Sequence, residues 1–132
     1  MHKGFMMAAA LLGAFSVALG AFGAHGLKSL LSDDALAVYH TGVEYQFYHV
    51  FAIVTTAFVW EKIPSKQLLW AGRLFISGIL FFSGSLYVMT WLRAFANKNV
   101  LWLGAITPIG GIMFIAGWLL LGWAVSIGLK DR

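Results

Sequence analysis

Long apolar runs that contain almost no charge constrain this chain more than any other feature. The first run extends from about Gly4 to Ala24, follows Lys3, and contains no charged residue. A helix needs about 20 apolar residues to cross the hydrocarbon core of a bilayer. Of the 132 residues, 61% are hydrophobic and 11% are charged, whereas soluble domains have about 25% charged residues. A soluble fold of this size would expose a large apolar surface to water, so we expect an integral membrane protein.

Loop signals divide the chain into four segments that are each long enough to span a membrane. The expected helices cover residues 4–24, 33–60, 67–92 and 101–127. Pro64 interrupts the chain between the second and third segments, and Asn97-Lys98-Asn99 lies between the third and fourth. We therefore predict an all-α fold, an integral membrane four-helix bundle that forms a single transmembrane domain over residues 1–132.

The first segment has a second interpretation, as a cleaved signal peptide. Phe22-Gly23-Ala24 loosely resembles a small-residue cleavage site. The apolar run is longer than the roughly 7–15 residues of a signal peptide, which favours a spanning helix. Small residues also recur in it at helical spacing, at Ser16, Gly20 and Ala24, and such residues let helices approach closely in lipid.

The second and fourth segments have unusual starts. Ser32 followed by Asp33 and Asp34 is typical of a helix N-terminus, and an unbroken helix from there to Trp60 would be about 42 Å long. We expect its first turns to lie in the membrane interface. In the fourth segment, Pro108 is expected to kink one continuous helix. The alternative is that Thr107 caps a helix that begins at Pro108, which leaves residues 101–106 as a re-entrant or interfacial stretch.

Lysine and arginine counts predict the orientation of the bundle in the cell membrane. With four spans, one side holds Lys3, Lys62, Lys66, Arg73, Lys130 and Arg132, and the other holds Lys28, Arg93 and Lys98. Positively charged residues are enriched on the cytoplasmic side, so we expect both termini in the cytoplasm. Tryptophans near the predicted helix ends fit an aromatic belt.

Composition also excludes several classes of function. The chain has no cysteine, which excludes disulfides, thiolate metal sites and cysteine nucleophiles. Its net charge of +4 comes from dispersed basic residues, so no nucleic-acid partner is expected. No phosphate-binding glycine loop or other cofactor motif is recognisable, and we predict no cofactor.

Polar residues are concentrated in the second helix. On an ideal helix, His40, Glu44 and Tyr48 share one face, and Tyr45 and His49 share another with Gln46 beside it. An ionisable residue inside a membrane is costly and points to function, provided that it lies deep enough. The other interpretation is a structural hydrogen-bonded cluster, in which Glu44 pairs with His40.

Three chemical roles remain open for these residues. A metal site could use His40 and Glu44 with His25, but zinc prefers four ligands, so we predict no metal. A proton relay could run through Glu44 and a histidine. A hydrolase would need Ser83 or Ser85 beside a histidine, but serines in small-residue stripes are usually packing residues, so we expect no enzyme.

Four motifs occur in order along the chain and together resemble a known family. They are Gly20-Ala21-Phe22-Gly23-Ala24-His25-Gly26, Tyr45-Gln46-Phe47-Tyr48-His49, Phe82-Ser83-Gly84-Ser85-Leu86-Tyr87 and Ile106-Thr107-Pro108-Ile109-Gly110-Gly111. The chain resembles the small bacterial membrane proteins of domain-of-unknown-function family 423, which are related to eukaryotic transmembrane protein 256. The resemblance implies a short, all-helical, multi-span membrane protein and supplies no reaction or ligand.

The predicted topology places most of the polar motif residues in the non-cytoplasmic half of the bundle. The candidate polar cluster comprises His25, His40, Glu44, Gln46, Tyr48, His49, Ser83, Ser85, Tyr87 and Thr107. The first hypothesis is a non-enzymatic structural or accessory component that contacts the lipid bilayer and either forms a homo-oligomer or binds a membrane protein partner. The second is a small transporter or channel-like protein that uses Glu44 and His49. The third is a lipid- or quinone-binding membrane protein.

Overall fold

The computed structural model describes the backbone of residues 1–130 and the side chains of residues 1–128. The regular elements in this range are helices, with no strand, as the all-α prediction required. Helix α1 covers Lys3–His25 and α2 covers Asp33–Lys62. The third long segment is a continuous rod made of α3 (Lys66–Gly78), η1 (Ile79–Ser83) and α4 (Gly84–Ala96). A short 3₁₀ turn, η2 (Leu101–Ala105), then precedes α5 (Thr107–Lys130).

Side-chain caps explain where three helices begin. The Ser32 hydroxyl accepts a hydrogen bond from the Ala35 N–H at 3.3 Å, so α2 begins where the sequence predicted. Ser65 caps α3 in the same way through the N–H of Leu68. At α1 the cap is His2, whose Nδ1 accepts from the Phe5 N–H at 3.1 Å, and sequence reasoning did not identify it. Each cap satisfies a backbone N–H that has no partner within its own helix.

The prediction of one kinked helix over residues 101–127 is wrong. Residues Leu101–Ala105 form the separate turn η2, and α5 begins only at Thr107. Pro108 therefore lies in the first turn of α5, where its missing N–H breaks no helical hydrogen bond and its fixed φ suits the helix. The alternative that starts the helix at Thr107 and Pro108 describes the structure better.

The third rod contains a feature that the sequence did not predict. Its middle segment η1 is a π-helical turn, so one extra residue is accommodated between α3 and α4. The turn lies against the first part of α5, where Gly110 is so close to Phe82 that a Cβ atom at position 110 would overlap the Phe82 backbone. The π turn thus lies where the backbones of the rod and α5 come into close contact.

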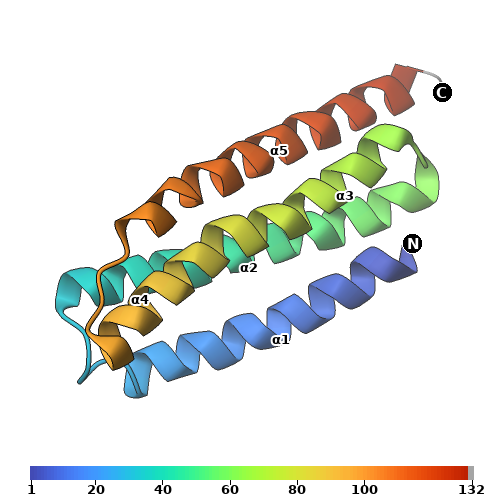
Figure 1. The fold of residues 1–132 in the computed structure, drawn as a ribbon. Helices are drawn as coiled ribbons and strands as arrows, with labels where there is room; N and C mark the ends of the chain where they lie inside the picture. Colours follow the sequence, from blue (N-terminus) through green and yellow to red (C-terminus); the bar gives the residue numbers. More distant parts are fainter. Residues whose placement is uncertain (131–132) are drawn as a thin grey trace.

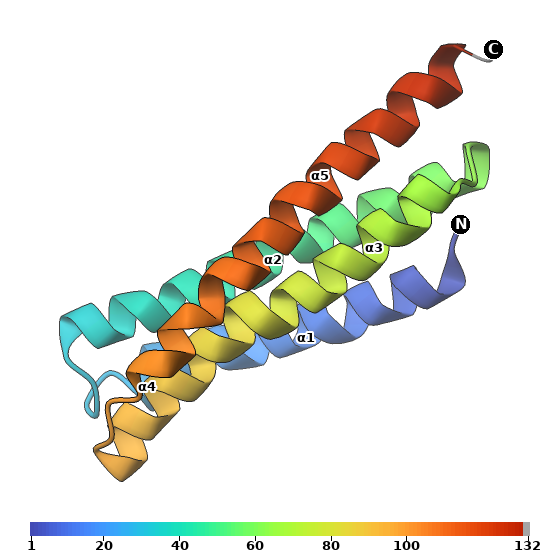
Figure 2. The ribbon, with the colours of Figure 1, turned by 45° about the horizontal axis from the view of Figure 1, so that its top comes forward.

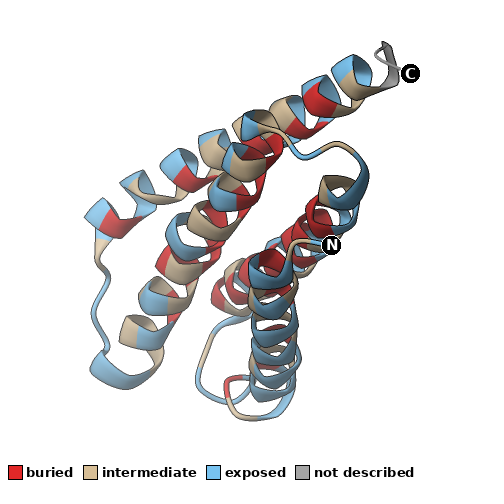
Figure 3. Ribbon diagram, turned by 90° about the vertical axis from the view of Figure 1, so that its right-hand side faces the viewer, coloured by how far each residue is buried: buried red, intermediate tan, exposed pale blue. Residues whose placement is uncertain are grey.

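Helix α2 packs against α1, the α3–α4 rod and α5 on one side and is exposed on the other. In Figures 1 and 2, α1 and α5 lie on opposite sides of α2 and the α3–α4 rod. The start of α1 and the end of α5 lie at the end of the molecule that also holds the α2–α3 connection. Buried residues follow the inner sides of the helices, and the outer sides are mostly exposed (Figure 3). The main apolar core includes Ile53 of α2, Leu68 and Phe75 of α3, and Phe114 of α5.

Small residues form the contact between α1 and α2. Gly13 of α1 faces Val50, and Gly20 faces Val43, with a Cβ position about 3.5 Å from each valine side chain. Ser16 lies between them and is fully buried, whereas Ala24 is exposed. Part of the predicted small-residue stripe therefore packs inside the chain, against α2.

Three helical segments are long and apolar enough to cross a membrane: Lys3–His25, Lys66–Ala96 and Leu101–Gly128. Helix α2 has 30 residues, which is long enough, but its acidic and other polar residues make it less apolar than the others. Its polar side chains are therefore the ones whose placement most needs an explanation.

Candidate functional site

Gln46 joins three helices in the interior. Its Nε2 donates to the Leu12 carbonyl of α1 at 2.8 Å, and its Oε1 accepts from the Tyr87 hydroxyl of α4 at 2.7 Å. The two bonds fix the orientation of the amide, because a carbonyl can only accept and the tyrosine proton needs an acceptor. Gln46 is 2% exposed, so both of its ends are satisfied away from solvent. We call the interhelical hydrogen bonds made by Tyr39, Gln46, Ser83, Ser85, Tyr87 and Thr107 the polar clasp.

Two serines of the rod extend the polar clasp. The Ser83 hydroxyl, at the end of the π turn, donates to the Gly42 carbonyl of α2 at 2.7 Å. The Ser85 hydroxyl donates to the Phe82 carbonyl at 2.9 Å, so its oxygen accepts from the Thr107 hydroxyl of α5 at 2.7 Å. The rod is thereby bonded to the helix that precedes it and to the helix that follows it.

Tyr39 completes the polar clasp at the α1–α2 contact. Its hydroxyl donates to the Leu19 carbonyl of α1 at 2.6 Å, and its ring packs beside that of Tyr87 with centroids 5.5 Å apart. Across residues 1–128, no buried side-chain nitrogen or oxygen lacks a hydrogen-bond partner. The clasp is therefore a closed, satisfied set of bonds between helices.

His49 lies outside the polar clasp, between α2 and α5. Its Nδ1 lies 2.6 Å from the Tyr45 carbonyl and its Nε2 lies 3.3 Å from Trp118 Nε1. Since the carbonyl accepts and the indole N–H donates, Nδ1 carries the proton and Nε2 is the acceptor, which makes the ring neutral. The imidazole stacks on Phe114 with centroids 3.4 Å apart and an angle of 6°.

An aromatic groove runs along this contact. It encloses a volume of about 490 Å³ and is lined by Tyr45, Tyr48, His49, Phe82, Gly111, Phe114, Ile115 and Trp118. No acidic or basic residue other than His49 lines it. The groove can therefore accommodate an apolar or planar molecule better than a charged one.

The remaining predicted residues do not join the others. Glu44 is exposed and makes no hydrogen bond or ion pair within residues 1–128, so the expected Glu44–His40 pair is not formed. The hydroxyl of Tyr48, whose side chain is 56% exposed, likewise bonds to nothing in that range. His25 bonds only to the Ala21 carbonyl of its own helix, at 3.1 Å.

The described residues provide little support for a metal site, a proton relay or a hydrolase site. No group of three His, Asp or Glu side chains within the described residues is placed to hold a metal ion. Glu44 and His49 lie on different faces of α2, one exposed and the other buried against α5. Ser83 and Ser85 donate to backbone carbonyls, and neither hydroxyl is bonded to a histidine.

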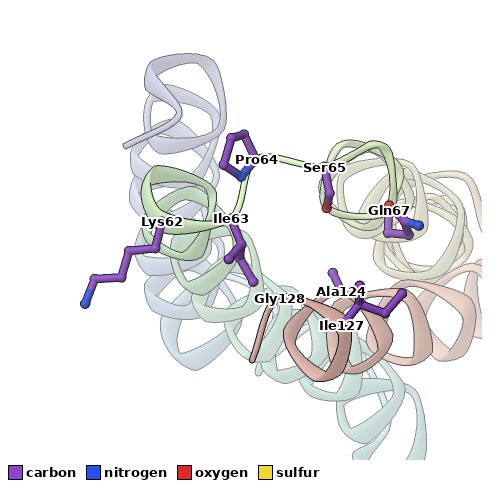
Figure 4. A pocket seen from close by; sticks show the side chains of 8 residues that line it. All are labelled: Lys62, Ile63, Pro64, Ser65, Gln67, Ala124, Ile127 and Gly128. Carbon is purple, nitrogen blue, oxygen red and sulfur yellow. The ribbon is translucent and has the colours of Figure 1, made fainter. Parts of the chain in front are cut away.

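A second hollow lies at the end of the molecule that holds the α2–α3 connection. It measures about 320 Å³ and lies between the α2–α3 connection and the last turns of α5, with Ile63 close to Gly128. Figure 4 shows that the Lys62 side chain extends away from the other lining residues. The Ser65 hydroxyl is already used as the α3 cap. This hollow brings together no group with evident chemistry.

Sequence reasoning missed three residues that matter at these contacts. Tyr39 and Trp118 supply hydrogen bonds between helices, and Phe114 stacks on His49. The aromatic-belt prediction concerns tryptophans near helix ends and does not include Trp118, and one-dimensional spacing does not reveal which tryptophan faces a histidine on another helix. Tyr39 could have been found, because it lies seven residues before Gln46 and therefore on the same side of α2.

Comparison with known proteins gives the same family over most of the chain. The model of the family described as "Protein of unknown function (DUF423)" matches residues 19–111. A UPF0382 membrane protein of Staphylococcus haemolyticus is 44% identical over 119 residues, which cover 90% of this chain and 92% of the relative. The UPF0382 membrane protein YwdK of Bacillus subtilis is 40% identical over 120 residues, with 90% and 93% covered.

The similarity extends beyond these bacteria. A UPF0382 membrane protein of Haemophilus influenzae is 41% identical over 124 residues, covering 93% of this chain and 94% of the relative. No solved structure matches the chain. The relatives are named as membrane proteins, and three apolar helices make this chain a multi-pass membrane protein of the cell membrane. The chain belongs to the DUF423 family of membrane proteins of unknown function, as its four sequence motifs indicated.

Proposed function

We propose that this protein is a four-span, single-domain structural or accessory component of the cell membrane, without enzymatic activity and with both termini in the cytoplasm. The observation that carries the proposal is the polar clasp. Its hydroxyl and amide groups, from Tyr39 to Thr107, are used in bonds between helices of the same chain. A catalytic or transporting site would need groups that are free to meet a substrate.

The fourth span is α2, and its packing supports this assignment. Its contacts with α1 run from Tyr39 near Gly23 to the Ala57 carbonyl, which accepts from the N–H of His2 at 2.9 Å. A helix packed along the length of a spanning helix crosses the same bilayer. Polar side chains are tolerated in such a helix when they face the interior of the bundle and are hydrogen-bonded there.

Orientation can be tested by single-cysteine labelling, because the chain has no cysteine of its own. We expect Ser29→Cys and Ala96→Cys, at one end of the bundle, to react with a membrane-impermeant maleimide in intact cells. Gln67→Cys, at the other end, should react only after permeabilisation. Labelling of all three sites from outside, or of Gln67→Cys alone, would contradict the four-span topology with cytoplasmic termini.

The structural or accessory role can be tested by isolation in a mild detergent. Native mass spectrometry should find the chain in a complex, either with copies of itself or with another membrane protein. A chain that is only monomeric and co-purifies with nothing would count against the role, even if the topology were as proposed.

A second candidate function rests on the aromatic groove between α2 and α5. Its aromatic lining and the hydroxyls of Tyr45 and Tyr48 at its surface suit a neutral lipid or a quinone whose carbonyls accept hydrogen bonds. We expect a short-chain quinone to quench the fluorescence of Trp118 in detergent, measured as the signal lost in Trp118→Phe. The matched control is Trp123→Phe, because Trp123 is similarly exposed and lies outside the groove. Equal quenching of both tryptophans would exclude a specific site.

A further inference from the structure

The outer side of α2 carries a row of outward-facing side chains, one of which, Tyr48, also lines the aromatic groove between α2 and α5. The members of the row are exposed or half-exposed and recur at alternating steps of four and three residues: Ala37, Thr41, Glu44, Tyr48, Phe51, Thr55 and Phe58. We call this row the α2 outer face. Steps of four and three place residues along one seam of a helix, which is the spacing by which two helices pack side by side.

Two groups on the α2 outer face are unsatisfied within the described chain. The threonine hydroxyls of this face are satisfied, because Thr41 and Thr55 donate to carbonyls of their own helix at 3.0 and 2.9 Å. The Glu44 carboxylate and the Tyr48 hydroxyl have no hydrogen-bond partner within residues 1–128. They lie one helical turn apart, and one is an acceptor while the other can donate.

The contact with α1 gives the depth of Glu44 in the membrane. Helix α1 has 23 residues, about 34 Å in length, and therefore just crosses a hydrocarbon core of about 30 Å. Gly13, near the middle of α1, faces Val50 of α2, which places Val50 near the centre of the bilayer. Glu44 precedes Val50 by six residues, or about 9 Å, and so lies within the apolar half-thickness of about 15 Å.

An exposed carboxylate at this depth faces lipid in the isolated chain. Such a group is expensive in hydrocarbon and is found paired or facing protein. The pairing must come from outside the chain, because α1, the α3–α4 rod and α5 pack on other sides of α2. The same argument applies more weakly to the Tyr48 hydroxyl.

We propose that a second copy of this chain covers the α2 outer face, so that the two α2 helices pack in parallel around a two-fold axis normal to the membrane. A two-fold axis brings the same surface of each copy together. The carboxylate of Glu44 in each copy then accepts from the Tyr48 hydroxyl of the other, and Phe51 and Phe58 pack across the axis. The same face thus supplies the donor, Tyr48, and the acceptor, Glu44, of two equivalent hydrogen bonds. The face is therefore complementary to a second copy of itself.

The inference rests on the proposed four-span topology, because Glu44 faces lipid only if α2 crosses the bilayer. The four-span topology and the dimer can be tested separately. Glu44→Cys in membranes should be shielded from a membrane-impermeant maleimide. Rapid labelling of that cysteine would overturn the α2 span, and the dimer with it. Shielding without the crosslinks described next would overturn the dimer alone.

The dimer is tested by oxidative crosslinking of single-cysteine variants of the full chain in native membranes. Thr55→Cys and Phe51→Cys should form covalent dimers. The matched control is Leu11→Cys, because Leu11 is 62% exposed, close to the 65% of Phe51, and lies at a similar depth on α1. Equal crosslinking at Leu11 and Phe51, crosslinking of Phe51 to a different protein, or no crosslink at Thr55 and Phe51 would overturn the proposal.

A second measurement isolates the two polar groups. Glu44→Leu and Tyr48→Phe should each weaken dimerisation by about tenfold, because each removes both symmetry-related hydrogen bonds from a lipid-embedded contact. Energy transfer between labelled copies in liposomes gives the monomer–dimer equilibrium, and helix content by circular dichroism controls for folding. Folded variants that dimerise as tightly as the parent would overturn the Glu44–Tyr48 pairing.

Discussion

The two sides of α2 contrast sharply in how their polar groups are satisfied. On the inner side, Tyr39 and Gln46 are bonded to α1 and α4, and His49 is bonded to Trp118 of α5. On the outer side, Glu44 and Tyr48 have no hydrogen-bond partner within residues 1–128. The inner groups are satisfied within the single chain, and the outer groups are those for which we propose a partner in a second copy. Polarity in a membrane helix can therefore indicate either intramolecular packing or assembly, and only the direction of the side chain distinguishes them.

The largest effect is expected where the inner packing is tightest. Gly110→Ala should destabilise the fold by about 2–3 kcal/mol, because the added Cβ overlaps the backbone of Phe82 and the rod must shift to relieve it. The matched control is Gly122→Ala on the same helix, where no atom lies within 4 Å of the added Cβ. Its effect should be neutral or slightly stabilising. Unfolding by denaturant in micelles measures both, and equal effects would show that α5 does not pack on η1 as described.

The polar clasp should give the next largest effect. Gln46→Leu leaves the Tyr87 hydroxyl without its acceptor, and we expect a loss of about 1–2 kcal/mol. Adding Tyr87→Phe should cost little more, because the two residues share one interaction. The double-mutant cycle is measured by the same unfolding assay. Additive losses would mean that the Gln46–Tyr87 bond contributes nothing in the membrane-like environment.

The smallest effect is expected at the His49–Trp118 contact, which lies on the inner side of α2 but outside the polar clasp. Trp118→Phe removes the donor to His49 Nε2, at the long distance of 3.3 Å, while the ring stays apolar. We expect a loss of about 0.6 kcal/mol, the average for hydrogen bonds between membrane helices. Trp123→Phe, on the exposed side of α5, should change stability by less than the resolution of the assay. A large loss of unfolding free energy in Trp118→Phe would show that the His49–Trp118 hydrogen bond stabilises the fold as strongly as the polar clasp.

Hydropathy and capping signals predicted most of the fold. The start of α2 at Ser32 and the boundaries of α1 and the third rod lie close to the predicted positions, because these ends follow from local chemistry. The π turn at Ile79–Ser83 was not predicted, since it depends on how Phe82 and Gly110 meet across two helices. The kink predicted at Pro108 is absent for a related reason. A proline fits both a kink and a first turn, and only the neighbouring helix decides between them.

The candidate site was only partly predictable. Residue type and topology placed Gln46, Ser83 and Tyr87 in one half of the bundle, and each of the three is hydrogen-bonded to another helix. Their exact partners could not be predicted, because Leu12 and Gly42 contribute backbone carbonyls that leave no mark in the sequence. Spacing on an ideal helix groups Glu44 with His40. Which side of α2 remains exposed depends instead on where the neighbouring helices pack.

The modest hydropathy of α2 has a consequence for how the protein is made. Three segments of the described chain are long and apolar enough to cross a membrane, and α2 is not among them. Less apolar segments enter the membrane less readily on their own. In the four-span topology that we propose, insertion of α2 is expected to be coupled to the α1 segment synthesised before it. The Leu12 and Leu19 carbonyls of α1 accept hydrogen bonds from Gln46 and Tyr39 of α2. Biogenesis of this small protein is thus expected to depend on the order in which its helices emerge from the ribosome, with α2 retained in the membrane by the helix already there.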